Sequence, residues 1–567
     1  MANDNPELEL SVNEGIKTKS NYLRGTISEG LLDNVTGAIS EDDQQLIKFH
    51  GIYQQDNRDI RAERRQQKLE PAYSFMIRSR VPGGVFDTKH WLLFDDLASK
   101  YGEENFRLTT RQAFQLHGVI KTNLKQTIKE INDSLLDTLA ACGDVNRNVM
   151  CSIAPHLGPV FHEVVKVADD ISAHLTPQTS AYHEIWLDGK QVNSEPPVEP
   201  IYGQTYLPRK FKIGIAIPPY NDIDVYSQDI GFIAIINDGK LKAFNIVVGG
   251  GMGTTHSDET TYPRAGSNIG SCLPEQVVDV AEKIVTIQRD FGNRSNRKRA
   301  RFKYTIDDRG INWLSTELNN RLGYNLGPAH AVMFNSSGDE YGWKTGADGK
   351  HHITLFIPQG RVVDEEKLKI RTALKEIAEI HNGEMILTPN QNLTISQITN
   401  ENRGKIEKLL KQHDILTAER LTTTRQRSIA CVALPTCALA MAEAERYLPD
   451  FITKFDALLT KNGLKNEEVS IRITGCPNGC ARPFLAEVAL IGKAPGLYNL
   501  YLGGGFVGQR LNKLYLESLN ESQILEKLEV IIQDYSKNRQ PKERFGDFTI
   551  RKGYIKEVTE GRLFHEN

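Results

Sequence analysis

The sequence predicts a mixed helix-and-strand fold that arose by internal duplication. The segment Arg107–Leu116 is echoed by Ile386–Ile395, and a strand, a glycine-bearing turn and a helix are expected before each copy. A second repeat relates Phe244–Gly251 to Tyr498–Gly505. We therefore expect pseudo-twofold symmetry, with a site at the junction of two halves that share one plan, roughly 70–335 and 336–567.

Length and composition describe a soluble chain of several domains. The 567 residues exceed the usual domain size of about 100–200 residues several times. A net charge of −3 gives no indication of binding to nucleic acid or to a membrane surface. The chain begins without a basic region or an apolar core, and it has no apolar run long enough to span a bilayer. Seven unevenly spaced cysteines indicate a reducing, cytoplasmic setting and no disulfide framework.

The first 70 residues are polar and rich in charge. Arg58–Arg65 mixes both signs, which predicts either a solvated surface segment or an arm that docks on a partner or on another domain. Order is expected to begin near Tyr73, with a strand over Tyr73–Val81 that the following proline and glycines end. A helix is expected around Trp91–Tyr101.

The next predicted strand, Phe106–Val119, carries a polar and basic face. Period two places one set of side chains on a single face: Arg107, Thr109, Arg111, Ala113, Gln115 and His117. Leu108, Phe114 and Leu116 are expected on the opposite, apolar face. One or two arginines usually mark a solvated face, but this row lies beside a strand that carries Arg78 and Arg80, so an anion-binding wall is favoured. The second copy has Ile386 and Asn390 where the first has Arg107 and Arg111, so anions are expected on the first half.

Four of the seven cysteines form two close pairs, a C-x5-C at Cys431 and Cys437 and a C-x3-C at Cys476 and Cys480. Four thiolates form a soft-metal site, which leaves an iron–sulfur cluster and zinc as candidates. C-x5-C is loose for a zinc knuckle, and buried, unligated thiols remain a third interpretation. A helix is predicted over Ala438–Leu448, with its dipole stabilising the thiolate of Cys437.

The remaining motifs predict no further chemistry. The glycine runs at 249–251 and 503–505 match neither a phosphate loop nor a dinucleotide fingerprint, so close backbone approach is favoured and no nucleotide site is expected. Electrons for any reduction must then come from another protein. Adjacent His351 and His352 should point to opposite faces of a strand. The cysteines outside the quartet are predicted to be ordinary thiols: Cys142, Cys151 and Cys272.

At these motifs the chain resembles the sulfite and nitrite reductases that contain sirohaem and a [4Fe–4S] cluster. The likeness rests above all on Cys431–Arg446 and Thr474–Pro483. Shorter matching segments extend it over nearly the whole chain: Asn21–Gly25, Arg58–Glu63, Tyr206–Lys212 and Phe545–Phe548. One departure is Ala438, where proline often follows the second cysteine; little effect on the cluster is expected.

The resemblance implies an α+β fold with two ferredoxin-like halves, related by a pseudo-twofold axis, that form one parachute-like unit, together with two α/β lobes for sirohaem and cluster. The implied division has five parts: an N-terminal arm for partner docking or wrapping (1–70), the first ferredoxin-like half (71–150), a lobe for sirohaem and sulfite (151–335), the second half (336–425) and a lobe for the cluster and sirohaem (426–567).

The resemblance also implies the site residues. Cys431, Cys437, Cys476 and Cys480 would ligate the [4Fe–4S] cluster, and Cys480 would also be the axial ligand of the sirohaem iron. Substrate contacts are implied for Arg78, Arg147, Lys210 and Lys212. Cofactor or pocket contacts are implied for Arg107, Arg111, Gln115, His117, Arg209 and Asn478. Cations suit this site because sirohaem carries many carboxylates and sulfite is an anion.

The implied reaction is the six-electron reduction of sulfite to hydrogen sulfide. A partner flavoprotein that oxidises NADPH would supply the electrons within a hetero-oligomer. Two alternatives keep the cofactors: a ferredoxin as the donor, and reduction of nitrite to ammonia. A third alternative, from a different class, is a zinc-stapled binding scaffold with no redox role.

Overall fold

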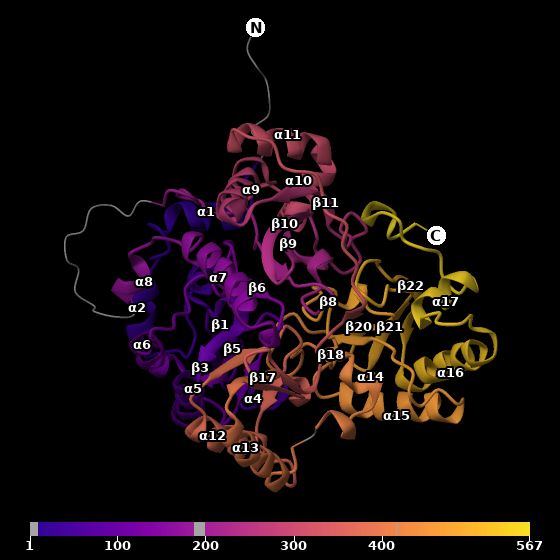
Figure 1. The fold of residues 1–567 in the computed structure, drawn as a ribbon. Coiled ribbons are helices and arrows are strands. Elements are labelled where there is room, and N and C mark those ends of the chain that lie inside the picture. Colours follow the sequence, from indigo (N-terminus) through magenta and orange to yellow (C-terminus); the bar gives the residue numbers. More distant parts are fainter. Residues whose placement is uncertain (1–8, 186–198, 416, 567) are drawn as a thin grey trace.

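The structure, a computed structural model, describes residues 9–185, 199–415 and 417–566 (Figure 1). The first eight residues of the predicted arm and residues 186–198 of the first predicted lobe lie outside the described residues. The described chain forms four five-stranded sheets, two in the ferredoxin-like halves and two in the lobes. In Figure 1 the first lobe lies at the top, beneath α9 (Val277–Phe291), and the second lobe lies at the right, with α15 (Leu448–Lys461) and α16 (Glu521–Asn538).

The sheets of the two halves have matching strand orders, β1-β2-β5-β4-β15 and β13-β14-β17-β16-β3. The equivalent strands are β1 (Ile52–Asp56) and β13 (Gly342–Thr345), β2 (Tyr73–Arg78) and β14 (His351–Leu355), β5 (Phe114–Val119) and β17 (Leu393–Ile398), and β4 (Phe106–Leu108) and β16 (Glu384–Leu387). Helices also correspond: α5 (Thr88–Tyr101) with α12 (Ile370–Ile380), and α6 (Leu124–Asp133) with α13 (Asn400–Gln412). The predicted duplication is confirmed.

Each half lends one short strand to the sheet of the other half. The strand β15 (Arg361–Val362) pairs antiparallel with β4, and β3 (Val85–Asp87) pairs antiparallel with β16. The crossing points need glycine, since a Cβ at Gly84 would lie 2.5 Å from the carbonyl oxygen of Leu387, and one at Gly360 would lie 2.2 Å from that of Leu108. The exchange covers a sheet edge in each half and joins the halves into one unit.

The continuous strand predicted over Phe106–Val119 is wrong. The chain forms β4, turns at residues 109–112 and returns as β5, so that Arg107 lies opposite Gln115. Gln112 adopts a φ of 48°, and its amide donates to the carbonyl oxygens of Cys151 and Leu387. These long-range bonds hold the turn against the first lobe, at Cys151, and against the second ferredoxin-like half, at Leu387. The alternation of polar and apolar residues along the chain cannot predict such bonds.

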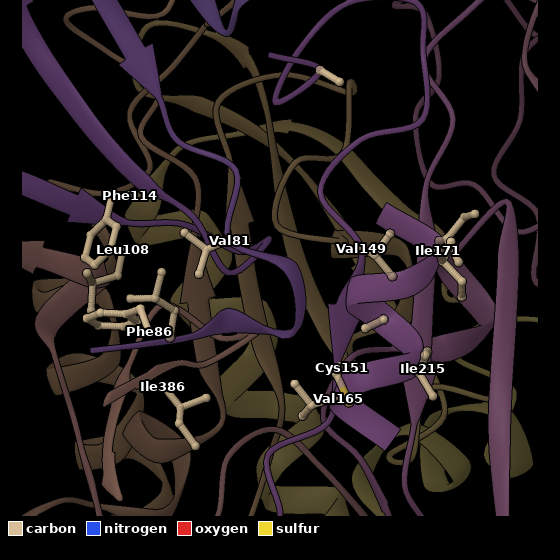
Figure 2. Close-up of a cluster of buried hydrophobic side chains, with 14 of the residues drawn as sticks. Val81, Phe86, Leu108, Phe114, Val149, Cys151, Val165, Ile171, Ile215 and Ile386 are labelled. Atoms are coloured by element: carbon tan, nitrogen blue, oxygen red, sulfur yellow. The ribbon is translucent and has the colours of Figure 1, made fainter. Parts of the chain in front are cut away.

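The apolar face of this hairpin is nevertheless as predicted. Leu108, Phe114 and Leu116 are fully buried. Phe114 packs edge-on against Phe86 of the exchanged strand β3, with ring centroids 4.8 Å apart. Figure 2 shows this cluster beside the core of the first lobe, which includes Val149, Cys151, Val165, Ile171 and Ile215.

The two lobe sheets also match strand for strand. The first contains β6 (Met150–Cys151), β7 (Ile213–Ala216), β9 (Ile230–Asn237), β10 (Lys240–Val248) and β11 (Ser267–Cys272). Their counterparts are β18 (Ser428–Ala430), β19 (Ile471–Thr474), β20 (Val488–Ala494), β21 (Leu497–Leu502) and β22 (Lys513–Leu519). In each sheet the first three strands are parallel and the rest antiparallel. Further helices are α7 (Pro159–His174), α10 (Phe302–Arg309), α11 (Ile311–Leu322) and α17 (Phe545–Arg551).

Order begins well before Tyr73, contrary to the prediction. The N-terminal segment forms α1 (Val12–Lys19), α2 (Ile27–Leu32), α3 (Glu41–Leu46) and β1, which pairs with β2. Leu23, Ile27 and Ile52 are fully buried. The apolar residues here are too sparse to show a period, so the sequence indicated only a polar arm. Within the segment, α4 (Arg61–Gln66) has no buried residue, in agreement with the solvated surface predicted there.

The glycine runs lie at the ends of equivalent strands, as the repeat predicted. A Cβ at Gly250 would lie 2.2 Å from the carbonyl oxygen of Tyr226, and one at Gly504 would lie 2.2 Å from that of Ala486. Both runs therefore permit close backbone approach, as predicted. Across the described part of the chain, no helix combines the length and apolar character needed to cross a membrane.

Candidate active site between the lobes

The cysteine quartet lies where two parallel strands of the second lobe end. Cys431 follows β18 directly, Cys476 follows β19 by two residues, and these strands are parallel neighbours. Both motifs therefore leave the same edge of one sheet. The backbone N–H of Gly475 donates to the sulfur of Cys431 at 3.4 Å. All four cysteines are free thiols, which leaves their sulfurs available as ligands.

The four thiols influence one another. Burial, and next the neighbouring Cys480, raises the pKa of Cys476 to about 12 and also raises the pKa of Cys431 and Cys437. Cys476 is buried, Cys431 and Cys437 are half-buried, and Cys480 is exposed. The quartet is thus gathered around Cys480, the member that faces open space.

The zinc alternative requires four ligands about 2.3 Å from one ion. Within residues 9–185, 199–415 and 417–566, no three His, Cys, Asp or Glu side chains converge closely enough to hold a single metal ion.

The helix predicted over Ala438–Leu448 is wrong, because turns occupy residues 438–447 and α15 begins only at Leu448. Carbonyl groups of this loop instead accept hydrogen bonds from a residue of the N-terminal segment. The guanidinium of Arg58 donates to the carbonyl oxygens of Cys437 at 3.0 Å and of Ala440 at 2.7 Å. These tertiary bonds override the local helix propensity, so no helix dipole acts on Cys437.

A cavity of about 270 Å³ lies between the first lobe and the C-x3-C loop. Five of its lining residues are cationic and none is acidic: Arg209, Lys210, Arg297, Lys298 and Arg301, with Gly253, Thr254, Thr255 and Asn478. Asn478 belongs to the cysteine motif itself. The cavity is therefore cationic, which suits an anionic ligand, and it borders the C-x3-C motif.

Two predicted lysines lead into this cavity along the segment before β7. Burial, reinforced by Arg209 and Arg301, lowers the pKa of Lys210 to about 7, and burial with Lys210 beside it lowers the pKa of Lys212. The charge of a Cys480 thiolate acts in the opposite direction and raises the pKa of both lysines. Cations that are costly to keep charged without a counterion suit an anionic ligand.

The first half contributes a second basic wall. Arg78 donates to the side-chain oxygen of Gln115 at 2.7 Å, and Gln115 is hydrogen-bonded to His117 at 2.6 Å. Burial opposes the charge of Arg78, but Cys142, Tyr53 and Cys480 outweigh it and raise its pKa. Arg147 is buried and donates to the carbonyl oxygens of Gly143 and Ala141.

Two predicted arginines occupy other surroundings. Arg107 forms a buried ion pair of 3.0 Å with Glu445, which lies in the loop over residues 438–447. Arg111 lies in the hairpin turn and donates to Gln228 at 2.9 Å, and burial with Arg147 nearby lowers its pKa to about 9. Buried N–H groups lack hydrogen-bond partners within the described chain at Arg107 Nη1, Arg111 Nε and Arg301 Nε. Of these three arginines Arg301 lines the cationic cavity, and an unpartnered donor there fits a polycarboxylate macrocycle such as sirohaem.

Sequence reasoning missed Arg297, Lys298 and Arg301 of the cavity lining. The signal was present, because five basic residues fall within Arg294–Arg301. Arg301 is held by a 3.0 Å ion pair to Asp229. Lys303, two residues further along, donates to the carbonyl oxygens of Gly251 and Gly253 and so supports the neighbouring wall of the cavity.

At the equivalent place in the second half threonines replace Arg78 and Gln115, and, among the described residues, Lys344 is the one lysine that lines the cavity there. Cross-strand pairing matches Thr354 and Thr394 to Arg78 and Gln115. The cavity there is small, about 20 Å³, and is lined by residues that include Asp222, Asp339 and Glu340. The prediction that the second copy lost its basic face is confirmed.

The other predicted side chains behave as ordinary structural residues, with one addition. Cys142, Cys151 and Cys272 are buried, and Cys142 also accepts a hydrogen bond from Arg78 at 3.3 Å. His351 binds Asn400 whereas His352 binds Ser396, so they have separate surroundings, as expected.

A duplicated α+β fold with a cysteine quartet beside a cationic cavity defines a class of redox protein, and comparison with known proteins agrees. The model of the "Nitrite/Sulfite reductase ferredoxin-like half domain" matches residues 67–134 and 344–413, and that of the "Nitrite and sulphite reductase 4Fe-4S domain" matches residues 167–326. The chain belongs to the nitrite and sulphite reductase family.

Within this family the chain is similar over its full length to proteins named sulfite reductase [NADPH] hemoprotein beta-component. The one from Oceanobacillus iheyensis is 57% identical, over 98% of this chain and 96% of that protein. The one from Staphylococcus saprophyticus is 58% identical, over 98% of each. The solved structure of the Mycobacterium tuberculosis NirA protein shares the fold, with a TM-score of 0.78, 21% identity, and 96% and 97% of the two chains covered.

The match to the 4Fe-4S domain falls on the first lobe, not on the quartet. Residues 167–326 contain one cysteine, Cys272, whereas all four clustered cysteines lie in the second lobe. Since the two lobe sheets are equivalent, the matched range describes a fold that occurs twice in this chain. The cysteines distinguish the second copy.

Proposed function

We propose that this chain is the haemoprotein subunit of an assimilatory sulfite reductase, and that it reduces sulfite to hydrogen sulfide at a sirohaem bridged to a [4Fe–4S] cluster. The observation that carries this proposal is the cationic cavity that reaches Asn478 of the C-x3-C motif, next to Cys480, the exposed member of the quartet. Relatives that are 57% and 58% identical over 98% of the chain carry the matching name.

The cofactors find their ligands in this arrangement. Cys431, Cys437, Cys476 and Cys480 would hold the cluster, and Cys480 would also be the protein ligand of the sirohaem iron. The cavity cations would bind carboxylates of the macrocycle, together with the side chains predicted from the resemblance: Arg107, Arg111, Gln115, His117, Arg209 and Asn478. When bound, the coupled cofactors supply an iron for the sulfur atom and a store of electrons.

Four cations act on the substrate. Arg78, Arg147, Lys210 and Lys212 attract sulfite and polarise its oxygens, which favours cleavage of the S–O bonds. Reduction of sulfite consumes protons, and an ammonium group whose pKa is about 7, as at Lys210, can release a proton from Nζ near neutral pH. The hydrogen bonds from Arg78 to Gln115 and from Gln115 to His117 fix the orientation of that guanidinium.

The electrons come from a partner flavoprotein that oxidises NADPH, in a cytoplasmic hetero-oligomer. Support for the donor comes from the printed names of the relatives, which contain both NADPH and beta-component. The N-terminal segment is the docking site, and its Arg58 donates a hydrogen bond to the carbonyl oxygen of Cys437 in the quartet. Comparing NADPH plus flavoprotein with reduced ferredoxin as donor tests this assignment, and kcat/KM for sulfite against nitrite tests the substrate.

Purified protein tests the proposal as a whole. The expected result is a sirohaem absorption spectrum, acid-labile sulfide and about five iron atoms per chain, four in the cluster and one in the macrocycle. Sulfide should accumulate when sulfite and a small reduced dye are supplied. A colourless protein that contains zinc and no iron would overturn the proposal.

A further inference from the structure

Arg482 follows Cys480 by two residues and lies at the centre of the molecule. It is 4% exposed, and its φ is 53°, in the left-handed region. Its backbone N–H donates to the carbonyl oxygen of Gly479 at 3.0 Å, which closes a turn around Cys480. A bulky side chain in this conformation needs strong tertiary support.

The guanidinium of Arg482 receives that support from three other parts of the chain. It forms an ion pair with Asp224 of the first lobe. It donates to the carbonyl oxygen of Thr110 at 2.9 Å, and to the carbonyl oxygen of Pro389 at 3.1 Å and the side-chain oxygen of Asn390 at 3.0 Å. One side chain of the second lobe thus binds the first lobe and both ferredoxin-like halves.

These contacts follow the pseudo-twofold symmetry. Thr110 lies in the turn between β4 and β5, and Asn390 lies in the equivalent turn between β16 and β17. The guanidinium therefore lies between the tips of two hairpins that the duplication made equivalent. A planar fork with five donors can bind both tips at once, which a lysine ammonium cannot do in the same geometry.

Thr110 also holds Cys480 directly. Its hydroxyl donates to the carbonyl oxygen of Cys480 at 3.1 Å, while its own carbonyl oxygen accepts from Arg482. Cys480 and Arg482 are therefore both hydrogen-bonded to Thr110 at the tip of the hairpin formed by β4 and β5. The main chain of Cys480 is fixed relative to the wall that carries Arg107, Gln115 and His117.

The charges around Arg482 are balanced by a shared carboxylate. Asp224 is bound by Arg472 at 2.7 Å as well as by Arg482, and both guanidiniums are buried. Burial opposes the ionisation of Asp224, but these two cations outweigh it and hold its pKa below the ordinary value. Removing either guanidinium leaves a buried, poorly paired group, so this ion cluster is rigid.

We propose that Arg482 is a positioning residue that fixes the backbone of Cys480, and hence its thiolate, relative to the cationic cavity. The proposal rests on the proposed function, which makes that thiolate the ligand shared by cluster and sirohaem. The position of the Cys480 thiolate is then determined by the packing of both lobes and both ferredoxin-like halves around Arg482, and not by the C-x3-C loop alone.

The first test compares Arg482→Lys with Arg427→Lys in holoenzyme. Arg427 is a matched control, because it too joins the second half to the second lobe, through the carbonyl oxygens of Ser337 and Asp339 and through Glu468. We expect Arg482→Lys to keep iron and labile sulfide, to shift the sirohaem absorption bands and reduction potential, and to lower kcat about a hundredfold with KM nearly unchanged. Arg427→Lys should leave these quantities unchanged.

The second test, Thr110→Val, removes the one hydroxyl that donates to Cys480 and keeps the side-chain shape. A spectral shift in the same direction and a fall of about tenfold in kcat are expected. This variant decides the matter if Arg482→Lys does not fold. The proposal would be overturned if Thr110→Val, or a folded Arg482→Lys protein, kept the sirohaem absorption bands, the reduction potential and the kcat of the wild type. Absence of iron and sulfite turnover in the wild-type protein would instead refute the proposed function.

Discussion

Asp229 and Glu487 occupy equivalent positions in the two lobes and accept the same backbone hydrogen bond. The carboxylate of Asp229 accepts from the N–H of Lys212 at 3.0 Å, and that of Glu487 accepts from the N–H of Ser470 at 2.9 Å. Each carboxylate lies directly before the third strand of its sheet. The pair shows how closely the duplicated scaffold was kept while its side chains diverged.

The same strand register explains why one lobe carries the cations that we propose act on the substrate. The residue held by the carboxylate is Lys212 in the first lobe and Ser470 in the second. Asp229 is also paired with Arg301, whereas Glu487 accepts from the N–H of Gly546. Equivalent backbones therefore position a lysine and an arginine in one lobe and neutral groups in the other.

Lys212→Ala should retain both cofactors and lose most sulfite turnover. Removing one preorganised cation from the charged centre is expected to lower kcat/KM about a hundredfold or more. The measurement is dye-driven sulfide production together with the absorption spectrum. Lys242→Ala is the control, because Lys242 is exposed on β10 of the same sheet. Loss of sirohaem from Lys212→Ala would show that the lysine has a structural role instead.

Cys480→Ser should disrupt the coupled cofactors, because a hydroxyl is a poor substitute for a shared thiolate. We expect loss of the sirohaem spectrum or of its coupling to the cluster, measured by absorption and paramagnetic resonance. Cys272→Ser serves as the control, since Cys272 is a buried thiol of the first lobe outside the quartet. An unchanged spectrum in Cys480→Ser would refute the bridging role.

Glu487→Gln should change how stability depends on pH. Burial raises the pKa of Glu487 to about 7, so the folded state binds the proton more tightly than the unfolded state does. Stability from this proton is present below about pH 4.5 and is lost as the pH rises through 7, by up to about 3 kcal/mol. The Glu487→Gln variant has no such proton to lose, so its stability does not fall in this way as the pH rises. The amount by which its thermal midpoint lies below that of the wild type should therefore be smaller at pH 8 than at pH 5.

The control for this prediction is Glu517→Gln, because Glu517 is exposed on β22 of the same sheet. It should leave the pH dependence of the thermal midpoint unchanged. A deficit of Glu487→Gln that stays constant from pH 5 to pH 8 would contradict the shifted carboxyl group.

The proposed docking site on the N-terminal segment needs a test that preserves the fold. Deleting residues 1–60 would remove β1 and the buried side chains of Leu23 and Ile27, so it should impair turnover with any donor. Charge reversal of exposed Arg65, in α4, and exposed Lys68, just after it, avoids this damage. We expect NADPH-driven turnover with the flavoprotein to fall about tenfold and dye-driven turnover to stay unchanged.

Reversal of Lys240 and Lys242, which are exposed on the first lobe, provides the matched control for this pair. It should affect neither assay. Equal loss of NADPH-driven and dye-driven turnover in the Arg65 and Lys68 variant would reject docking at α4.

Local sequence signals were reliable where a side chain's neighbours lie nearby in the chain. The duplication, the apolar face at Leu108 and Phe114, and the close approach at the glycine runs were all predicted correctly. The failures came where long-range bonds override local preference. Gln112 bends the predicted strand through contacts with Cys151 and Leu387, and Arg58 binds the carbonyl groups of the loop that was expected to be a helix.

By itself the sequence determined the cysteine spacing, the two-copy plan and the loss of basic residues from the second copy, because each is a property of residue order. Only the tertiary structure decided that Cys480 is the exposed thiol, that Arg301 lines its cavity and that Arg482 ties its loop to both halves. Arg482 and Thr110 are 372 residues apart and touch through a hydrogen bond. No local period encodes such a contact, because it forms only when separately folded sheets pack together.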